Sequence, residues 1–169
     1  MLFRSLIQRH AGDERRVAAL ARRQERELRR WLYGSGVAEA ASLVDALADV
    51  AAEIEELHGI RIELANAGDA PLDDDLRQLV LAAREAMTNA AKFSGVEEIF
   101  VYAESGHEEI VVFVRDSGVG FERAAVAADR RGIVESIEGR MQRAGGTATV
   151  VSAPGQGTEV ELRLPRSSA

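Results

Sequence analysis

A long run of apolar residues at helical spacing is the feature that most constrains the fold of this chain. From about Asp73 onward, apolar side chains recur every three or four residues, which places them on one face of an α-helix. The residues on this face are Leu76, Leu79, Val80, Ala83, Met87 and Ala90. We therefore predict one long helix that packs on a core with this face.

The remaining segments predict a mixture of helices and strands. Ser42 is a suitable N-cap for a helix whose apolar stripe ends at Leu57, and a helix over 132–144 ends at Gly145-Gly146. Segment 117–131 is predicted to be a loop. Strands are predicted at 60–64, 97–103, 109–115, 147–152 and 159–164. Because most strands come late, with helices between them, we expect an α+β two-layer sandwich in which helices cover one face of a mixed sheet.

The first 36 residues are predicted to form a separate helical piece. Residues 13–33 carry an apolar stripe typical of a helix, and Gly34-Ser35-Gly36 then breaks it. The boundary therefore divides the chain into 1–36 and 37–169. Arginines on such a helix also suit nucleic acid or a membrane surface, but interspersed glutamates favour packing between helices. We expect a homodimer formed through this helix.

Composition excludes several classes of protein. The 169 residues include no cysteine, so disulfide frameworks, zinc ribbons and thiol catalysis are excluded. The formal net charge of −7 argues against nucleic acid as the main partner. No apolar run approaches the ~20 residues of a membrane span, and no secretory signal opens the chain. We expect a cytoplasmic chain that makes no membrane contact itself.

Three polar residues share one face of the predicted long helix. Glu85, Asn89 and Lys92 follow one another at i, i+4 and i+7. A carboxylate, an amide oxygen and an ammonium together suit a Mg²⁺-bound polyphosphate. They also suit the solvated face of an ordinary amphipathic helix. Asparagine is a mediocre helix former, however, so Asn89 in the middle of a helix calls for a functional reason.

A second polar motif follows an apolar strand. Asp116 ends the strand and is followed by Ser117, Gly118, Val119 and Gly120. This is also ordinary turn chemistry. It lacks the third glycine of a dinucleotide fingerprint, and the chain contains no phosphate-binding Gly-Lys-Ser or Gly-Lys-Thr loop. Together with the helical triplet, in this order, it suggests an ATP site of another kind.

Four motifs in order resemble the boxes of the Bergerat-fold ATPases, the superfamily of DNA gyrase, MutL and the histidine kinases. They are 85–93, 116–121, Arg131-Gly132-Ile133 and 155–160, which match the N, G1, G2 and G3 boxes. The pattern of Glu85, Asn89 and Lys92 followed by an aromatic residue resembles the histidine-kinase branch. Segments 139–146 and 152–155 are similar to the nitrate-sensor-like subfamily. The resemblance covers roughly residues 40–165.

The resemblance implies ATP and Mg²⁺ as cofactors and a role for each matched residue. Glu85 would be the general base beside the γ-phosphate and approach the metal, Asn89 would coordinate Mg²⁺, and Lys92 would neutralise phosphate charge. It also implies that Asp116 accepts the adenine amino group, that Gly118 and Gly120 let the chain pass close to the base, that Gly132 and Ile133 start a helix, and that Thr158 supports the adenine pocket.

Two positions depart from the family pattern. Phe93 stands where the family has His or Tyr, and its ring can still stack on adenine. The family usually has two glycines before the helix of the G2 box, whereas this chain has arginines, and our hypothesis is that Arg130 or Arg131 binds phosphate.

The implied activity is that of a sensor histidine kinase. Such a kinase transfers the γ-phosphoryl group of ATP to a histidine on a dimerisation helix, and a response regulator then receives it. In this family an acidic residue follows that histidine. His10 and His58 lack one, and His107 lies in a predicted hairpin. We expect the acceptor upstream of residue 1, with 1–36 as a remnant of the dimerisation hairpin, and no self-phosphorylation by this chain.

Two other functions fit the same motifs. An anti-sigma-factor type of serine kinase shares the boxes but lacks preceding dimerisation helices, so the helix at 13–33 weighs against it. A catalytically inactive nucleotide-binding scaffold is the second alternative, and intact Glu85, Asn89 and Asp116 weigh against that. The sequence does not identify the stimulus or the cognate response regulator.

Overall fold

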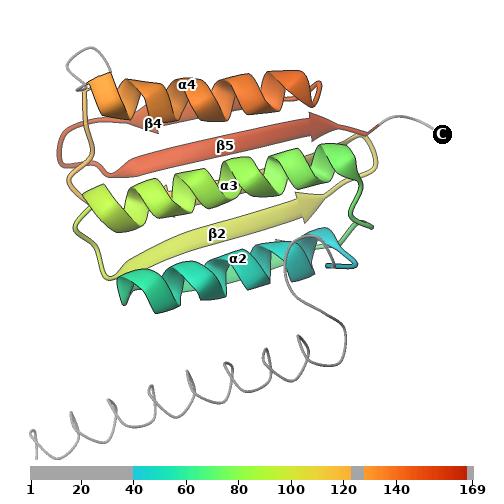
Figure 1. Ribbon diagram of the computed structural model, residues 1–169, viewed down its shortest axis with the longest axis horizontal. Helices are drawn as coiled ribbons and strands as arrows, with labels where there is room; N and C mark the ends of the chain where they lie inside the picture. The colour runs from blue at the N-terminus through green and yellow to red at the C-terminus, as the bar shows by residue number, and fades with distance from the viewer. Residues whose placement is uncertain (1–39, 123–127, 167–169) are drawn as a thin grey trace, which may run out of the picture. The chain divides into compact units, whose positions relative to one another are not determined.

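Three helices and five strands make up the described part of the chain, residues 40–122 and 128–166 of a computed structural model (Figure 1). In chain order these are α2 (Leu43–His58), β1 (Arg61–Ala67), α3 (Asp74–Phe93), β2 (Glu98–Ser105), β3 (Glu109–Asp116), α4 (Ala128–Arg143), β4 (Thr147–Ser152) and β5 (Thr158–Pro165). The predicted helix at 13–33 and the boundary at 34–36 lie outside the described residues.

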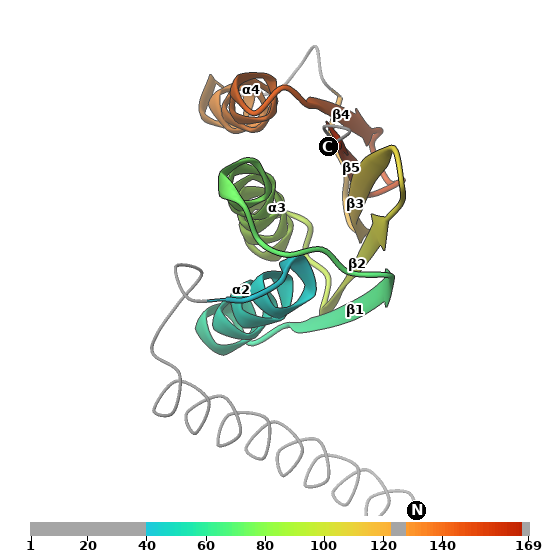
Figure 2. The ribbon, with the colours of Figure 1, turned by 90° about the vertical axis from the view of Figure 1, so that its right-hand side faces the viewer.

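The five strands form one mixed sheet. Their order is β1-β2-β3-β5-β4, with β1 and β2 parallel and every other neighbouring pair antiparallel. Helices α2, α3 and α4 all lie on the same face of this sheet (Figure 2). The alternating strands point their apolar side chains toward the helices, as at Ile99, Val112 and Leu162, which are fully buried. The predicted α+β two-layer sandwich is confirmed.

Helix α3 is the central helix of the helical layer. It starts at Asp74, and the side chain of the preceding Asp73 caps it by accepting a hydrogen bond from the backbone N–H of Leu76 at 2.8 Å. Every apolar residue of the predicted stripe is buried. Ala82 and Ala86 are buried as well, because α2 and α4 flank α3 and also pack against it. None of the described helices combines the length and the apolar character that a membrane span needs.

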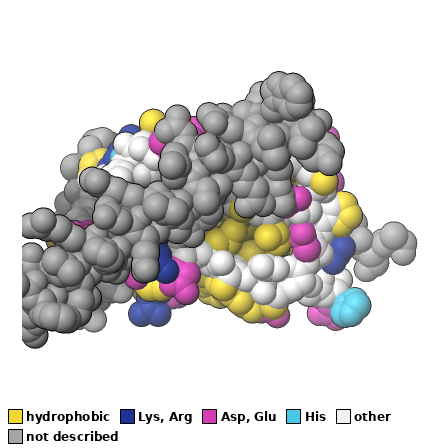
Figure 3. All heavy atoms as spheres, turned by 90° about the horizontal axis from the view of Figure 1, so that it is seen from below, with side chains coloured by type: hydrophobic (Ala, Val, Ile, Leu, Met, Phe, Trp, Pro, Cys, Tyr) yellow, Lys and Arg dark blue, Asp and Glu magenta, His cyan; other side chains and the backbone are white. Residues whose placement is uncertain are grey.

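Helix α2 has the predicted start and one unexpected exposed residue. The Ser42 hydroxyl accepts from the backbone N–H of Asp45, and Gly59 ends the helix with a φ of 67°. Leu57, which the apolar stripe places on the buried face, is 68% exposed in the last turn. Viewed from the α2 side, hydrophobic side chains are visible at the surface beside acidic ones (Figure 3). The stripe therefore extends one turn beyond the buried surface.

Helix α4 begins earlier than the sequence predicts. The predicted start was residue 132, whereas the helix begins at Ala128, so Arg131, Gly132 and Ile133 lie inside it. The prediction was wrong because the glycine at 132 suggested a boundary, whereas a single glycine can stand inside a helix. The predicted C-terminal end is confirmed by Gly145, which has a φ of 77°.

Candidate functional site

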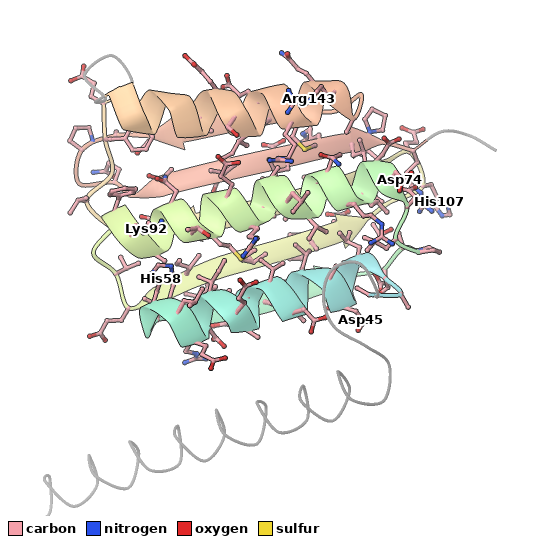
Figure 4. All side chains as sticks on the ribbon, in the orientation of Figure 1. Asp45, His58, Asp74, Lys92, His107 and Arg143 are labelled. Atoms are coloured by element: carbon pink, nitrogen blue, oxygen red, sulfur yellow. The ribbon has the colours of Figure 1, made fainter. Side chains whose placement is uncertain are left out.

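Residues of both polar motifs meet in one pocket at one end of the domain. The C-terminal end of α3, the last residue of β3, the first residue of β5 and the loop after β3 contribute to it. Lys92 marks this end of α3 in Figure 4, and His107 lies at the opposite end of the sheet. The pocket is lined by Asn89, Ala90, Phe93, Ser94, Asp116, Val119, Gly120, Phe121 and Thr158.

The three predicted residues of α3 occupy different environments. Asn89 lines the pocket, Glu85 is half-buried one turn earlier, and Lys92 is exposed. The hydroxyl of Ser136 on α4 donates a hydrogen bond to the Glu85 carboxylate at 3.1 Å. This bond connects α3 to α4, so the position of Glu85 depends on both helices.

Asn89 has an unused oxygen. Its Oδ1 atom is buried and has no hydrogen-bond partner among the described residues. A buried amide oxygen without a partner costs free energy, and a cation offsets that cost by accepting it as a ligand. No group of three His, Cys, Asp or Glu side chains within 40–122 and 128–166 is placed to hold a metal ion. The Asn89 oxygen by itself fits Mg²⁺, which is commonly bound through one or two protein oxygens together with the phosphates of a nucleotide.

Asp116 is a buried carboxylate held in a fixed orientation. It is 4% exposed, and its Oδ1 accepts a hydrogen bond from the backbone N–H of Gly118 at 2.9 Å. Burial raises the pKa of Asp116 above its ordinary value, although hydrogen bonds from the backbone N–H groups of Gly118 and Thr158 act in the opposite direction. A buried acceptor fixed in this way can select a ligand by its N–H groups.

Two glycines are required by close packing between chain segments. A Cβ atom on Gly118 would lie 2.2 Å from the carbonyl oxygen of Ser94, and one on Gly120 would lie 2.0 Å from the carbonyl oxygen of Ala153. Gly120 also has a φ of 57°. The backbone N–H of Val119 donates to Ser94 at 3.0 Å in the same place. These glycines therefore hold the pocket wall together, a constraint that the resemblance did not provide.

The sequence prediction and the pocket agree only in part. Asn89, Phe93, Asp116, Gly120 and Thr158 are predicted residues that line it. Glu85, Lys92, Gly118 and Gly132 are described but are not among the lining residues, and the side chains of Arg131 and Ile133 lie outside the described part.

Several residues of the site had no role in the sequence prediction. Ser94, Val119 and Phe121 line the pocket, and Ser136 contacts Glu85. Val119 and Phe121 lie within the predicted motif at 116–121, but no ligand contact was predicted for them. Ser94 and Ser136 carried no signal in the sequence, because their contacts join segments that are distant in the sequence.

Comparison with known proteins points to a single family. Residues 74–168 match the family model described as histidine kinase-, DNA gyrase B-, and HSP90-like ATPase. The chain is 34% identical over 90 residues to an uncharacterized sensor-like histidine kinase of Chloroflexus aurantiacus, covering 50% of this chain and 15% of that protein. It is 28% identical over 130 residues to the sensor histidine kinase LiaS of Bacillus subtilis, covering 75% of this chain and 35% of LiaS. The chain thus spans a minor part of the length of both relatives.

A solved structure gives the same result for the fold. The ATP-binding domain of PrrB from Mycobacterium tuberculosis superposes with a TM-score of 0.60 at 24% identity, covering 75% of this chain and 96% of that one. Since the family model covers more than half of the sequence, this chain belongs to the histidine kinase-, DNA gyrase B- and HSP90-like ATPases.

Proposed function

We propose that this chain binds Mg²⁺-ATP and promotes transfer of the γ-phosphoryl group to a histidine, from which a response regulator receives it. The observation that carries the proposal is the convergence of a buried, hydrogen-bonded Asp116 and a buried, unpartnered Asn89 oxygen on one pocket. The first fits the amino group of adenine and the second fits Mg²⁺. The names of the sensor-kinase relatives support the histidine as acceptor.

The proposed roles follow the positions of the residues. Asp116 and Thr158 bind the base, Phe93 contacts its ring, and Asn89 holds the metal. Glu85 lies one turn away on α3 and acts as general base, approaching the metal, while exposed Lys92 offsets phosphate charge. Arg131, Gly132 and Ile133 contribute to phosphate binding from the first turns of α4. Catalysis in such a site rests on positioning and charge stabilisation.

Gly118 and Gly120 support the base by shaping the loop against Ser94 and Ala153. We also propose that the protein acts as a homodimer through the helix predicted at 13–33. Residues 1–36 then belong to the dimerisation hairpin and 37–169 to the catalytic domain.

Removing the Asn89 oxygen is expected to abolish the Mg²⁺ dependence of ATP binding. In Asn89→Ala the metal loses its protein ligand, so calorimetry should give the same weak affinity for ATP with Mg²⁺ and with a chelator. The unchanged chain should bind ATP at least tenfold more tightly with Mg²⁺, the effect of roughly one ligand interaction. Equal affinity of the unchanged chain under both conditions would contradict the proposed metal site.

Incubation with radiolabelled ATP is expected to leave no acid-labile phosphate on this chain. The proposed acceptor is a histidine outside residues 1–169. His107 lies at the end of the domain opposite Lys92, and His58 is half-buried at the end of α2 (Figure 4). Any phosphate that is stable in base and labile in acid can be located by phosphopeptide mapping. Label on His10, His58 or His107 would defeat the expectation.

A further inference from the structure

Three polar residues of adjacent strands lie in one row across the sheet. Asp116 of β3 pairs with Thr158 of β5, and Thr158 pairs in turn with Ser152 of β4. Paired residues point to the same face of a sheet, here the face that α3 and α4 cover. Asp116 and Thr158 line the pocket, whereas Ser152, which lies next to Thr158 on β4, is not among the lining residues and has no role in the proposed function.

The Ser152 hydroxyl makes three contacts of equal length. It accepts a hydrogen bond from the backbone N–H of Phe121 at 2.9 Å and donates one to the carbonyl oxygen of Gly157 at 2.9 Å. Its third contact is the hydroxyl oxygen of Thr158, also at 2.9 Å. The distance alone does not show which of the two hydroxyl groups is the donor. One side chain thus joins the loop after β3, the loop before β5 and a pocket-lining residue.

Counting protons settles the direction of the third contact. A serine hydroxyl has one proton to donate and two lone pairs to accept with. The carbonyl oxygen of Gly157 can only accept, so it takes the Ser152 proton. The contact with Thr158 then requires the Thr158 proton, which points at Ser152 and away from the pocket. Thr158 is left with lone pairs alone for a ligand.

We infer that Ser152 is a specificity-determining residue that acts through Thr158: by taking the Thr158 proton, it makes the base-binding end of the pocket a pair of hydrogen-bond acceptors. This inference rests on the proposed function. Ionised Asp116 is also an acceptor only. Two acceptors favour a base that presents an amino group at this position and disfavour one that presents a carbonyl oxygen, because two acceptors facing each other leave buried groups unpaired.

The test compares ATP with inosine triphosphate, whose base carries a carbonyl in place of the adenine amino group. Calorimetry with Mg²⁺ should show that the unchanged chain prefers ATP. In Ser152→Ala the Thr158 hydroxyl is free to rotate and donate to that carbonyl. The preference should therefore fall by roughly tenfold, the effect of one hydrogen bond of this kind. Ser152→Thr keeps the hydroxyl and should keep the preference.

A double-mutant cycle separates this role from simple loosening of the loops. Thr158→Val removes the hydroxyl but keeps the backbone N–H that donates a hydrogen bond to Asp116. By itself this variant should lower the preference for ATP over inosine triphosphate. Adding Ser152→Ala to it should then leave the preference unchanged. Ser105→Ala, at the end of β2 away from the pocket, is the matched control and should behave like the unchanged chain. Thermal unfolding establishes that each variant is folded.

The outcomes distinguish the inference from the proposed function. If Ser152→Ala weakens ATP and inosine triphosphate by the same factor, or if it still alters the preference in the Thr158→Val background, Ser152 has a structural role only and the inference is wrong. An unchanged chain that binds both nucleotides equally well also overturns it. An unchanged chain that binds neither overturns the proposed function as well.

Discussion

Asp116→Asn is expected to weaken ATP binding on the order of 100-fold, because a charge-assisted hydrogen bond to the base is lost in a buried site. The asparagine is uncharged and can turn an N–H group toward the adenine amino group, which then faces another donor. Calorimetry with Mg²⁺-ATP measures the loss. Retention of wild-type affinity would remove Asp116 from the site and with it the proposed mode of base binding.

The same substitution gives a pH-dependent stability test. Burial raises the pKa of Asp116, against the hydrogen bonds from Gly118 and Thr158, so the folded state binds the proton more tightly than the unfolded chain does. The tighter binding of this proton stabilises the folded state fully below the pKa of Asp116 in the unfolded chain, about 3.9. That stabilisation is lost as the pH rises through the pKa of Asp116 in the folded state. The stability of the unchanged chain, relative to Asp116→Asn, should therefore fall as the pH rises from the unfolded to the folded pKa of Asp116. At higher pH the difference should stay constant. Denaturant unfolding at several pH values measures this difference.

Asp69 provides a control of opposite sign. Burial, the largest single influence, raises its pKa, but hydrogen bonds from Ser42, Val44 and Ala70 together lower the pKa below its ordinary value. Its contribution to stability is present above the unfolded pKa and is lost as the pH falls through the folded one. The stability difference between the unchanged chain and Asp69→Asn should therefore shrink toward acid. If the stability difference for Asp116→Asn also shrank toward acid, the assignment for Asp116 would be refuted.

Gly120→Ala is expected to destabilise the domain strongly and to remove ATP binding. The left-handed backbone alone costs an alanine about 1–2 kcal/mol. In addition, the new methyl group would lie 2.0 Å from the carbonyl oxygen of Ala153, so the two loops of the pocket must separate. Thermal unfolding and calorimetry with ATP measure the two effects.

Comparison with Gly59→Ala isolates the contribution of the steric overlap between the new methyl group at position 120 and Ala153. Gly59 has a similar φ of 67°, but a Cβ atom there would have nothing within 4 Å. This variant should show only the conformational cost and should bind ATP normally. If both variants lost the same stability, the close approach at Gly120 would have no energetic consequence.

The elements that could be predicted from the sequence are those whose pattern is local. In α3, apolar and polar residues obey one spacing, so the helix, its buried face and the position of Asn89 all follow from periodicity. The strands alternate clearly enough to give their positions within a few residues. The start of α4 could not be predicted in this way, because Gly132 resembles a boundary although it lies inside the helix.

The parts of the site that escaped prediction depend on contacts between distant segments. Glu85 and Ser136 meet only because α3 and α4 pack side by side. Asp116 lies opposite Thr158 because β3 pairs with β5 and not with the next strand in the sequence. A local pattern contains no information on that order of strands. The resemblance supplied Asp116 and Thr158 as site residues, but it assigned no role to Ser152, although Ser152 begins one of the segments that carry it.

The shared row of Asp116, Thr158 and Ser152 limits which changes in chain length the domain can tolerate. Side chains alternate along a strand, so one extra residue in β5 between Thr158 and buried Val160 would either turn Thr158 to the opposite face or move Val160 out of the core. Insertions and deletions should therefore be rare between Thr158 and Leu164 in relatives of this domain.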